Sequence, residues 1–298
     1  MIGAVNLSSY LGSWAENVSE RKKIALTIEC LADACKTIAS QLECGALLGS
    51  FGASTGRQSG IDKQKEIDVR ANDIIVNSLK ECPVAAYASE ELDAPLIIHA
   101  GGDLAVAVDP IDGSSNIDSN ITLGTIFSVL PVRAEGRDGS SFLQKGQEQL
   151  AAGFAVYGPS TIFVMTVGSG TQIFTLERAS GRFIRTAFSV AIPLVTHEFS
   201  INSSNYRHWE DCVKIYVDDL LRGKEGPREK DFNMRWTATP VADIFRILVR
   251  GGIFLYPGDL REGYTMGRLR LVYEANHLAF IVKQAGGAAS TGHGRILD

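Results

Sequence analysis

The sequence predicts an α/β protein built from two α/β units, one over residues 1–190 and the other over residues 191–298. Three observations support this. Residues 24–42 carry apolar side chains at intervals of three and four, the pattern of an amphipathic helix. Residues 104–187 hold six short β-rich runs separated by Gly, Ser and charged turns. Beyond these runs, helical and strand-like patterns alternate, which indicates a second α/β unit.

Two helices are expected to open the fold. The first ends at Cys44, before Gly45, because glycine readily terminates a helix. The second runs from about Asp68 to Cys82. Residues 49–66 between them are rich in Gly and Ser and are expected to form a loop, and such loops often close over substrates.

The middle of the chain predicts a large, mostly antiparallel or mixed sheet. Its six expected strands are LAVAVD, TLGTIFSVLPV, LAAGFAVYG, TIFVMTV, TQIFTL and RFIRTA. Residues 133–149, between two of these strands, are polar, and we expect them to form an exposed excursion.

The C-terminal unit is expected to contain three helices and two strands. The expected helices cover residues 208–226, 240–250 and 275–287, and the expected strands cover 251–257 and 267–274. Pro240 suits the first turn of the second of these helices, because a proline lacks only an N–H that has no partner there.

Composition and charge exclude several classes of function. The 298 residues are 45% hydrophobic, and the formal net charge of -5 provides no basic surface for nucleic acid. No apolar run approaches the roughly 20 residues of a membrane helix. The N-terminal segment lacks the basic flank and apolar core of a signal peptide. We therefore expect a cytoplasmic protein that binds neither nucleic acid nor membranes. The scattered cysteines, without a CxxC pair, favour free thiols.

The stretch VDPIDGSSNID, residues 108–118, contains two carboxylates three residues apart. Pro110 favours an extended backbone at Asp109. Gly113 permits a reversal that would bring Asp112 toward Asp109. Two carboxylates about 4 Å apart repel by roughly 4 kcal/mol at an effective dielectric near 20, so their convergence requires a cation or a shared proton. Oxygen ligands favour Mg²⁺ or Mn²⁺ over Zn²⁺. The alternative is an ordinary surface turn, since Asp-Pro and Asp-Gly are common turn signals.

Small and polar residues directly after the two aspartates suit a phosphate group. They offer closely spaced N–H groups and hydroxyls with little steric cover. These residues are Gly113, Ser114, Ser115 and Asn116. Further acidic candidates for the same site are Glu90, Glu91 and Glu274. Metal and phosphate would then share one site.

Several blocks of the sequence occur in the order found in class I fructose-1,6-bisphosphatases, which belong to the lithium-sensitive sugar-phosphatase superfamily. The blocks are SEE, DPIDGSSNID, GTIF, DFNMRW, VADI, GGIFLYP and GRLRLVYEAN followed by AGG. The sequence resembles this family over nearly its whole length, and it looks most similar to the bacterial Calvin-cycle type. The resemblance implies a layered α-β-α-β-α fold and a homotetramer. It also implies magnesium-dependent hydrolysis of D-fructose 1,6-bisphosphate to fructose 6-phosphate and phosphate, in gluconeogenesis or the Calvin cycle.

The resemblance further implies roles for individual residues. Two or more Mg²⁺ ions per subunit, with Mn²⁺ as an alternative, would be bound by the side chains of Glu90, Asp109, Asp112 and Glu274 and the backbone carbonyl of Ile111. Asp62 would reach a further metal, and Glu91 with Asp68 would prepare the attacking water. The 1-phosphate would be bound by Gly113, Ser114 and Ser115. The far phosphate would be bound by Asn202, Arg235, Tyr256 and Arg268.

Within the resemblance, three positions have particular implications. Arg235 would reach into the site of a neighbouring subunit. Arg268 replaces a lysine of the family, which keeps the charge and adds a planar fork suited to phosphate. Trp236 stands where the vertebrate enzymes usually have tyrosine.

Three alternative functions stay open at this stage. The sequence does not determine the length of the sugar, so a dual or predominant sedoheptulose-1,7-bisphosphatase is the nearest alternative. An inositol-phosphatase-like enzyme would share the DP-x-DG element, although Gly-Thr typically follows it there. An inactive scaffold is disfavoured, because a cluster of like charges is costly to maintain without a function.

Overall fold

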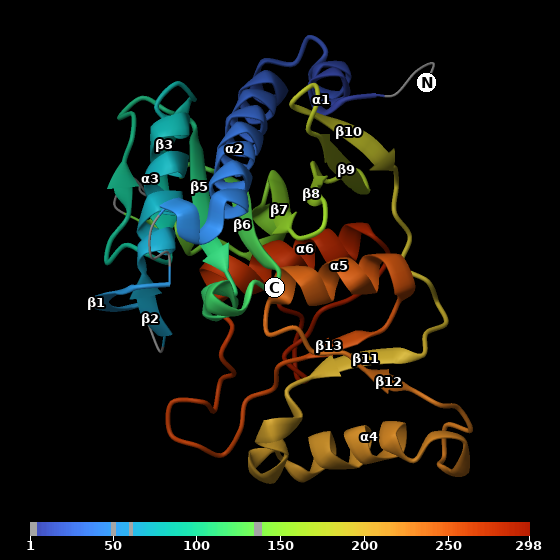
Figure 1. Cartoon of the computed structure of the whole chain (residues 1–298). Coiled ribbons are helices and arrows are strands. Elements are labelled where there is room, and N and C mark those ends of the chain that lie inside the picture. Colours follow the sequence, from blue (N-terminus) through green and yellow to red (C-terminus); the bar gives the residue numbers. More distant parts are fainter. Residues whose placement is uncertain (1–4, 49–51, 60–61, 134–138) are drawn as a thin grey trace.

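The computed structural model describes residues 5–48, 52–59, 62–133 and 139–298. Its helices are α1 (Leu7–Ala15), α2 (Ser19–Cys44), α3 (Glu66–Leu79), α4 (Asp211–Leu221), α5 (Pro240–Arg250) and α6 (Asn276–Gln284). Figure 1 shows five stacked layers: α1, α2 and α3, then a large sheet, then α5 and α6, then a small sheet, and finally α4. This arrangement confirms the expected α/β class and the α-β-α-β-α layering.

The large sheet has eight strands in the order β10-β9-β8-β7-β6-β5-β3-β4. The strands are β3 (Val84–Ser89), β4 (Leu96–Ile97), β5 (Leu104–Asp112), β6 (Leu123–Pro131), β7 (Ala151–Tyr157), β8 (Thr161–Thr166), β9 (Thr171–Glu177) and β10 (Arg182–Ala187). Among its described strands, β3 and β5 pair in parallel and the other neighbours pair antiparallel. The six strands expected from the sequence are β5 to β10, so that prediction is confirmed.

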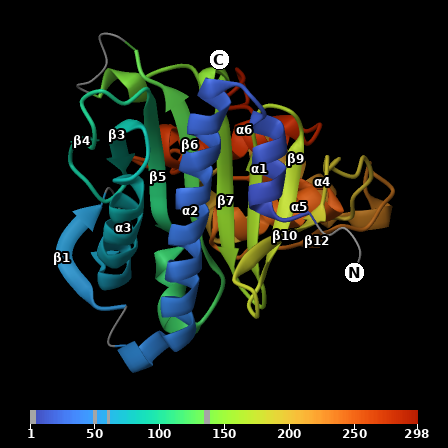
Figure 2. The ribbon, with the colours of Figure 1, turned by 90° about the horizontal axis from the view of Figure 1, so that it is seen from above.

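Helices bury the large sheet on both faces. On one face the apolar stripe of α2, with Ile28 and Ile38 fully buried, packs in one core with β-strand residues such as Phe163. Figure 2 shows α2 lying along the sheet between α3 and α1. On the other face, Ile281 of α6 belongs to a second core with Phe154 of β7. Burial on both faces explains why β5, β6 and β7 are almost continuously apolar.

The small sheet consists of three parallel strands in the order β12-β11-β13. These strands are β11 (Glu198–Ile201), β12 (Asn233–Met234) and β13 (Ile253–Leu255). One face packs against α4, where Phe199 and Trp209 share a core with Val217. Because the strands are parallel, their carboxyl ends meet at one edge of the sheet. The expected division of the chain at residue 190 stays a prediction.

Two predicted loops contain more order than expected. In residues 49–66, the described parts form an antiparallel hairpin of β1 (Ser54–Ser59) and β2 (Asp62–Lys65). In residues 133–149, the expectation of an exposed excursion is only partly right for the described part, because Leu143 is exposed but Phe142 and Gln144 are buried. The amide of Gln144 donates hydrogen bonds to the carbonyls of Pro131 and Ser141, each at 2.7 Å, which ties this segment to the end of β6.

Two secondary-structure predictions are corrected. The expected strand over 267–274 does not form, and Leu271–Ala275 is instead a helical turn of the π type that leads into α6. The apolar alternation of GRLRLVYE favoured a strand, but the backbone N–H groups of Glu274 and Ala275 donate to the carbonyl of Arg270. The helix α1 was missed, although Leu7 and Leu11 have helical spacing and Asn6 caps the helix. In the described part of the chain, no helix is both long and apolar enough to cross a membrane.

Candidate active site

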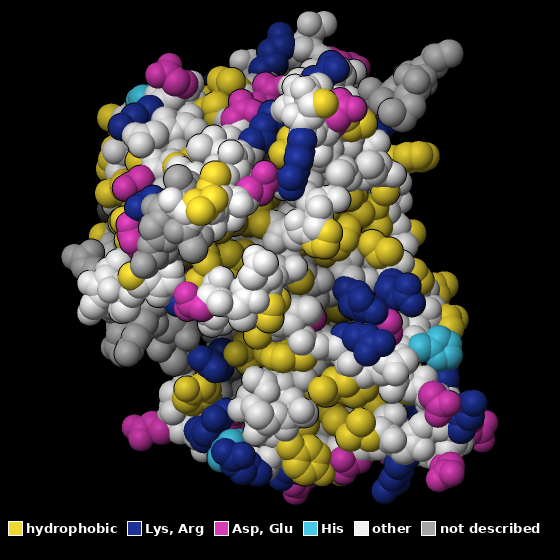
Figure 3. All heavy atoms as spheres, in the orientation of Figure 1, with side chains coloured by type: hydrophobic (Ala, Val, Ile, Leu, Met, Phe, Trp, Pro, Cys, Tyr) yellow, Lys and Arg dark blue, Asp and Glu magenta, His cyan; other side chains and the backbone are white. Residues whose placement is uncertain are grey.

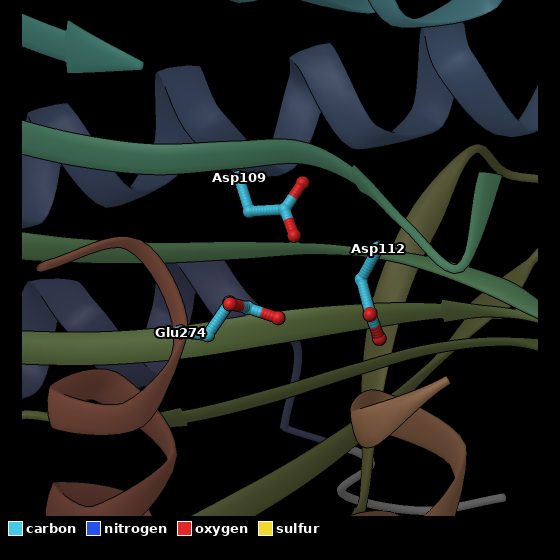
Figure 4. A group of neighbouring side chains, drawn as sticks. All are labelled: Asp109, Asp112 and Glu274. Carbon is cyan, nitrogen blue, oxygen red and sulfur yellow. The ribbon is translucent and has the colours of Figure 1, made fainter. Parts of the chain in front are cut away.

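Three buried carboxylates converge near the end of β5. Asp109 and Asp112 lie on β5, and Glu274 lies in the helical turn before α6 (Figure 4). Carboxylate oxygens of the three side chains lie within 4.8 Å of one another. In a regular strand, residues three apart point to opposite faces. The pairing of β5 with β6 is irregular between Asp109 and Asp112, and this irregularity lets both side chains face one point.

Glu90 and Arg270 adjoin this group. Glu90 follows β3, and its backbone N–H donates to the carbonyl of Val108 on β5 at 3.1 Å. The Arg270 guanidinium lies 2.8 Å from Glu90 Oε1 and 3.8 Å from Glu274 Oε2. The backbone N–H of Arg270 also donates to Glu274 Oε2 at 2.5 Å. Arg270 therefore holds Glu90 and Glu274 together and offsets part of their charge.

Burial disfavours ionisation of the acids of this site and raises their pKa values. Desolvation raises the pKa of Glu90 to about 8 and that of Asp112 to about 6. Desolvation, with the charge of Glu90 next in weight, holds the pKa of Asp109 well above its usual range. Asp109 Oδ1 is buried and has no hydrogen-bond partner among the described residues. A set of acidic oxygen donors that includes such an atom fits Mg²⁺ or Mn²⁺.

The site should make the stability of the metal-free protein depend on pH. The folded pKa of Glu90 is about 8, against about 4.3 for an unfolded glutamate, so the folded state binds more protons between these values. The free energy of unfolding should therefore fall as the pH rises from 6 to 8. A divalent cation should reverse this trend, because it binds the ionised carboxylates and releases their protons.

Thermal unfolding at pH 6 and pH 8, with EDTA or with Mg²⁺, measures this dependence. The Tm in EDTA should be lower at pH 8, and the rise in Tm caused by Mg²⁺ should be larger there. A Tm in EDTA that increases between pH 6 and pH 8 would contradict this account of the acidic site.

The first turn of α5 supports Asp112. The hydroxyl of Thr239 donates to Asp112 Oδ2 at 2.5 Å, and the backbone N–H of Val241 donates to the same oxygen at 2.8 Å. Gly113 lies so close to Thr239 that a Cβ on Gly113 would be 2.6 Å from the Thr239 Cβ. Gly113 also has a φ of 78°. Only glycine therefore fits this position without displacing Thr239.

The residues expected to prepare the attacking water lie beside the hairpin and α3. Glu91 accepts a hydrogen bond from Gln64 Nε2 of β2 at 2.6 Å, and burial raises the pKa of Glu91. Asp68 is buried in the first turn of α3, where it accepts the backbone N–H of Lys65 at 2.7 Å. The side chain of Asp62 lies outside the described part of the structure. The roles of these acids stay predictions.

The residues expected to bind the 1-phosphate lie directly after Asp109 and Asp112. Ser114 and Ser115 begin a 3₁₀ turn that covers Ser114–Ser119, and Gly113 precedes it in the left-handed conformation. Ser115 is exposed and Ser114 is half-buried, so a ligand can approach both. Ile111 lies in the irregular part of β5, between the two aspartates. The sequence order alone therefore places this turn next to the carboxylates.

Three residues expected at the far phosphate follow the three strands of the small sheet. Asn202 follows β11, Arg235 follows β12 and Tyr256 follows β13. They therefore lie at the edge where the carboxyl ends of these parallel strands meet, the usual place of a ligand in a parallel sheet. Arg268 lies in the segment that leads to the helical turn, with its guanidinium 5.2 Å from the ring centroid of Tyr264.

Arg235 joins a group of arginines around one glutamate. Arg235, Arg246 and Arg250 lie 4.0, 2.6 and 3.3 Å from Glu198. Figure 3 shows basic side chains gathered at the level between α5 and the small sheet. The Arg235 side chain is 47% exposed, which leaves it accessible to a ligand or to another subunit.

Sequence reasoning missed three residues that shape the site: Arg270, Thr239 and Gln64. Arg270 lies in the block GRLRLVYEAN, but the strand expected there does not predict that Arg270 lies close to Glu90. Thr239 directly precedes Pro240, and this order predicts that Thr239 is a helix N-cap. It does not predict a contact with Asp112, which lies 127 positions earlier in the chain. Gln64 lies in a segment that was expected to be a loop.

Comparisons with known proteins cover almost the whole chain. The family model "Fructose-1-6-bisphosphatase, N-terminal domain" matches residues 10–187, and "Fructose-1-6-bisphosphatase, C-terminal domain" matches residues 192–298. The class 1 fructose-1,6-bisphosphatase of Rhizobium meliloti is 52% identical, with all of this chain and 86% of that protein aligned. The corresponding protein of Azorhizobium caulinodans is 50% identical, with 99% of this chain and 91% of that protein aligned.

Solved structures agree with this similarity. The crystal structure of Leishmania major fructose-1,6-bisphosphatase in its holo form superimposes with a TM-score of 0.91 and 32% identity, over 99% of this chain and 91% of that chain. The apo form of the same protein superimposes with a TM-score of 0.86. Sequence and fold agree over the full length, and the chain belongs to the fructose-1,6-bisphosphatase family.

Proposed function

We propose that this chain is a magnesium-dependent phosphatase that removes the phosphate on C1 of D-fructose 1,6-bisphosphate and leaves fructose 6-phosphate. The observation that carries the proposal is the convergence of the buried carboxylates of Asp109, Asp112 and Glu274 directly before the Gly113–Ser115 turn. This arrangement places acidic oxygen donors beside small residues that can approach a phosphate.

The metal site would use every acid of the cluster. Its ligands would be the side chains of Glu90, Asp109, Asp112 and Glu274 and the backbone carbonyl of Ile111. Four carboxylates beside the Arg270 guanidinium leave a negative charge that supports two or more Mg²⁺ ions per subunit, with Mn²⁺ as an alternative. When bound, such ions stabilise charge on the transferring phosphoryl group and lower the pKa of the attacking water.

The remaining residues would bind the 1-phosphate and move protons. Ser114 and Ser115 would donate hydrogen bonds to the 1-phosphate oxygens. Glu91, with Asp68, would accept the proton of the attacking water. The water oxygen then bonds to phosphorus while the bond from phosphorus to the oxygen on C1 breaks, and that oxygen takes up a proton to become the hydroxyl of fructose 6-phosphate. Asp62 would reach a further metal.

The far phosphate would lie at the carboxyl edge of the small sheet. Asn202, Arg235 and Tyr256 share this edge, and Arg268 would add a second guanidinium. A doubly charged phosphate needs cationic hydrogen-bond donors. Arginine suits this role because its planar pair of N–H groups matches two phosphate oxygens. Binding of the far phosphate at this edge would direct the other end of the sugar toward the acidic cluster.

The assembly would be a cytoplasmic homotetramer, with residues 1–190 providing the metal and 1-phosphate site and residues 191–298 the sugar and far-phosphate site. Arg235 would reach into a neighbouring subunit's site, and its 47% exposed side chain supports this role.

The identity of the product tests which phosphate is removed. With fructose 1,6-bisphosphate, the protein should form fructose 6-phosphate and inorganic phosphate in equal amounts. The sugar product is measured by coupling it to glucose-6-phosphate isomerase and a dehydrogenase. Release of fructose 1-phosphate instead would contradict the assignment of the Ser114–Ser115 turn to the 1-phosphate.

A further inference from the structure

One short segment connects the far-phosphate residues with the acidic cluster. We propose that Thr239 is a positioning residue for Asp112, and that the segment Arg235–Val241 couples binding of the far phosphate to the placement of that carboxylate. This inference rests on the proposed function, because it assumes that Asp112 binds metal and that Tyr256 binds the far phosphate of its own subunit's site, which Arg235 of a neighbouring subunit would complete.

At one end of the segment, α5 and Asp112 support each other. Thr239 is the N-cap residue of α5 and is fully buried, but its hydroxyl does not cap the helix. The hydroxyl donates instead to Asp112 Oδ2 at 2.5 Å. The same oxygen accepts the N–H of Val241, one of the first-turn N–H groups that have no partner within the helix. Asp112 therefore caps α5, and the helix in turn fixes the carboxylate.

The middle of the segment is held on both sides. The carbonyl of Thr237 accepts a hydrogen bond from Asn116 Nδ2 at 2.9 Å, and Asn116 belongs to the turn that would bind the 1-phosphate. The hydroxyl of Thr237 donates to Asp243 Oδ2 of α5 at 3.0 Å. Ala238 has a φ of 59°, a conformation that a non-glycine residue adopts only when its surroundings impose it. These contacts leave the segment little freedom to shift without moving Asp112.

The other end of the segment is part of the far-phosphate region. The backbone N–H of Arg235 donates to the carbonyl of Phe199 on β11 at 2.8 Å. The ring of Trp236 stacks on Phe254, with ring centroids 5.9 Å apart and an interplanar angle of 2°. It also meets the ring of Tyr256 edge-on at 5.4 Å. A far phosphate that orders Tyr256 therefore also orders Trp236, and with it a segment that ends on Asp112. Arg235, at the start of this segment, would reach into the neighbouring subunit's site.

This connection gives the far phosphate a way to accelerate cleavage at the other end of the sugar. Binding energy from a remote group raises turnover when it is used to place the reacting groups. Replacement of a side chain that orients a metal ligand typically costs about 10- to 100-fold in metal affinity or activity. Loss of the Thr239 hydroxyl should therefore lower turnover on the bisphosphate without removing any contact to the sugar.

The central variant is Thr239→Val, which removes the hydroxyl and keeps the shape. Its kcat with fructose 1,6-bisphosphate should fall about 10- to 100-fold with little change in KM. Thr239→Ser should keep kcat near the wild-type value. The matched control is Thr171→Val, which removes a buried hydroxyl that donates to the Ile281 carbonyl at 2.8 Å, away from the site. Equal loss in Thr171→Val, or no rescue by serine, would overturn the proposal.

Coupling is tested with fructose 1-phosphate, which lacks the far phosphate. Thr239→Val should lower kcat on the bisphosphate far more than on fructose 1-phosphate. The kcat of the double variant Arg235→Ala with Thr239→Val should fall by much less than the product of the factors by which the two single variants lower it. If the kcat loss of the double variant equals the product of the two single losses, the coupling is overturned.

A binding measurement keeps the proposal testable if Thr239→Val does not fold. Because coupling is reciprocal, fructose 6-phosphate should tighten Mg²⁺ binding to the wild type several-fold, but not to Arg235→Ala. Calorimetric titration of Mg²⁺ with and without fructose 6-phosphate measures this. Unchanged Mg²⁺ affinity in the wild type would overturn the coupling alone if bisphosphate hydrolysis is intact. A wild type that does not hydrolyse the bisphosphate would overturn the proposed function itself.

Discussion

Replacing Asp112 with asparagine should abolish magnesium-dependent phosphate release, with kcat falling at least about 1,000-fold. Asparagine keeps an oxygen that can accept the hydrogen bonds from Thr239 and Val241, so the first turn of α5 should stay in place. It removes the charge that would bind the cation. Phosphate release from fructose 1,6-bisphosphate at saturating Mg²⁺ measures the effect.

Two further measurements separate loss of metal from loss of fold in Asp112→Asn. Its Tm in EDTA should be at least that of the wild type, because a buried charge among other carboxylates is removed. Mg²⁺ should raise this Tm less than it does in the wild type. The control Asp103→Asn changes an exposed aspartate that pairs with Lys23 on α2, and it should keep normal turnover. Persistent hydrolysis by Asp112→Asn would show that the metal assignment is wrong.

Replacing Glu91 with glutamine should lower kcat by about 100- to 10,000-fold and change KM little, because a general base contributes about that factor to the chemical step. Glutamine keeps the size of the side chain and can still accept the hydrogen bond from Gln64 Nε2, which is 2.6 Å long in the structure. The pH dependence of kcat should lose its acidic limb, since the group that must be deprotonated is gone.

The control for this variant is Glu81→Gln, which changes an exposed glutamate between α3 and β3. It should leave kcat and its pH dependence unchanged. If Glu91→Gln retains both the rate and the acidic limb, another group accepts the proton of the attacking water.

One long helix, six strands of the large sheet and the central turn could be predicted from the sequence because they depend on local patterns. Apolar spacing of three and four identified α2, and β-rich runs between turns identified β5 to β10. Pro110 and Gly113 predicted a backbone that brings Asp109 and Asp112 together. The structure shows how this happens: the irregular pairing of β5 with β6, rather than the glycine alone, turns both carboxylates to one side.

Contacts between distant segments could not be predicted in the same way. The alternation in GRLRLVYE is compatible with a strand, and only packing beside β5 favours the helical turn that brings Arg270 and Glu274 together. Thr239 had the features of a helix cap, and its actual partner lies on another layer of the fold. Three of the residues expected at the far phosphate follow three separate strands, and only the parallel order β12-β11-β13 places them at one edge.

The measurement that most directly tests the central claim is phosphate release from fructose 1,6-bisphosphate, with and without Mg²⁺, beside a parallel assay with sedoheptulose 1,7-bisphosphate. We expect rapid release from fructose 1,6-bisphosphate that stops in EDTA and returns when Mg²⁺ is added. The rate of phosphate release from sedoheptulose 1,7-bisphosphate then establishes whether the enzyme hydrolyses one sugar bisphosphate or both. Release that continues in EDTA, or no release from either sugar with Mg²⁺ present, would contradict a magnesium-dependent sugar-bisphosphatase.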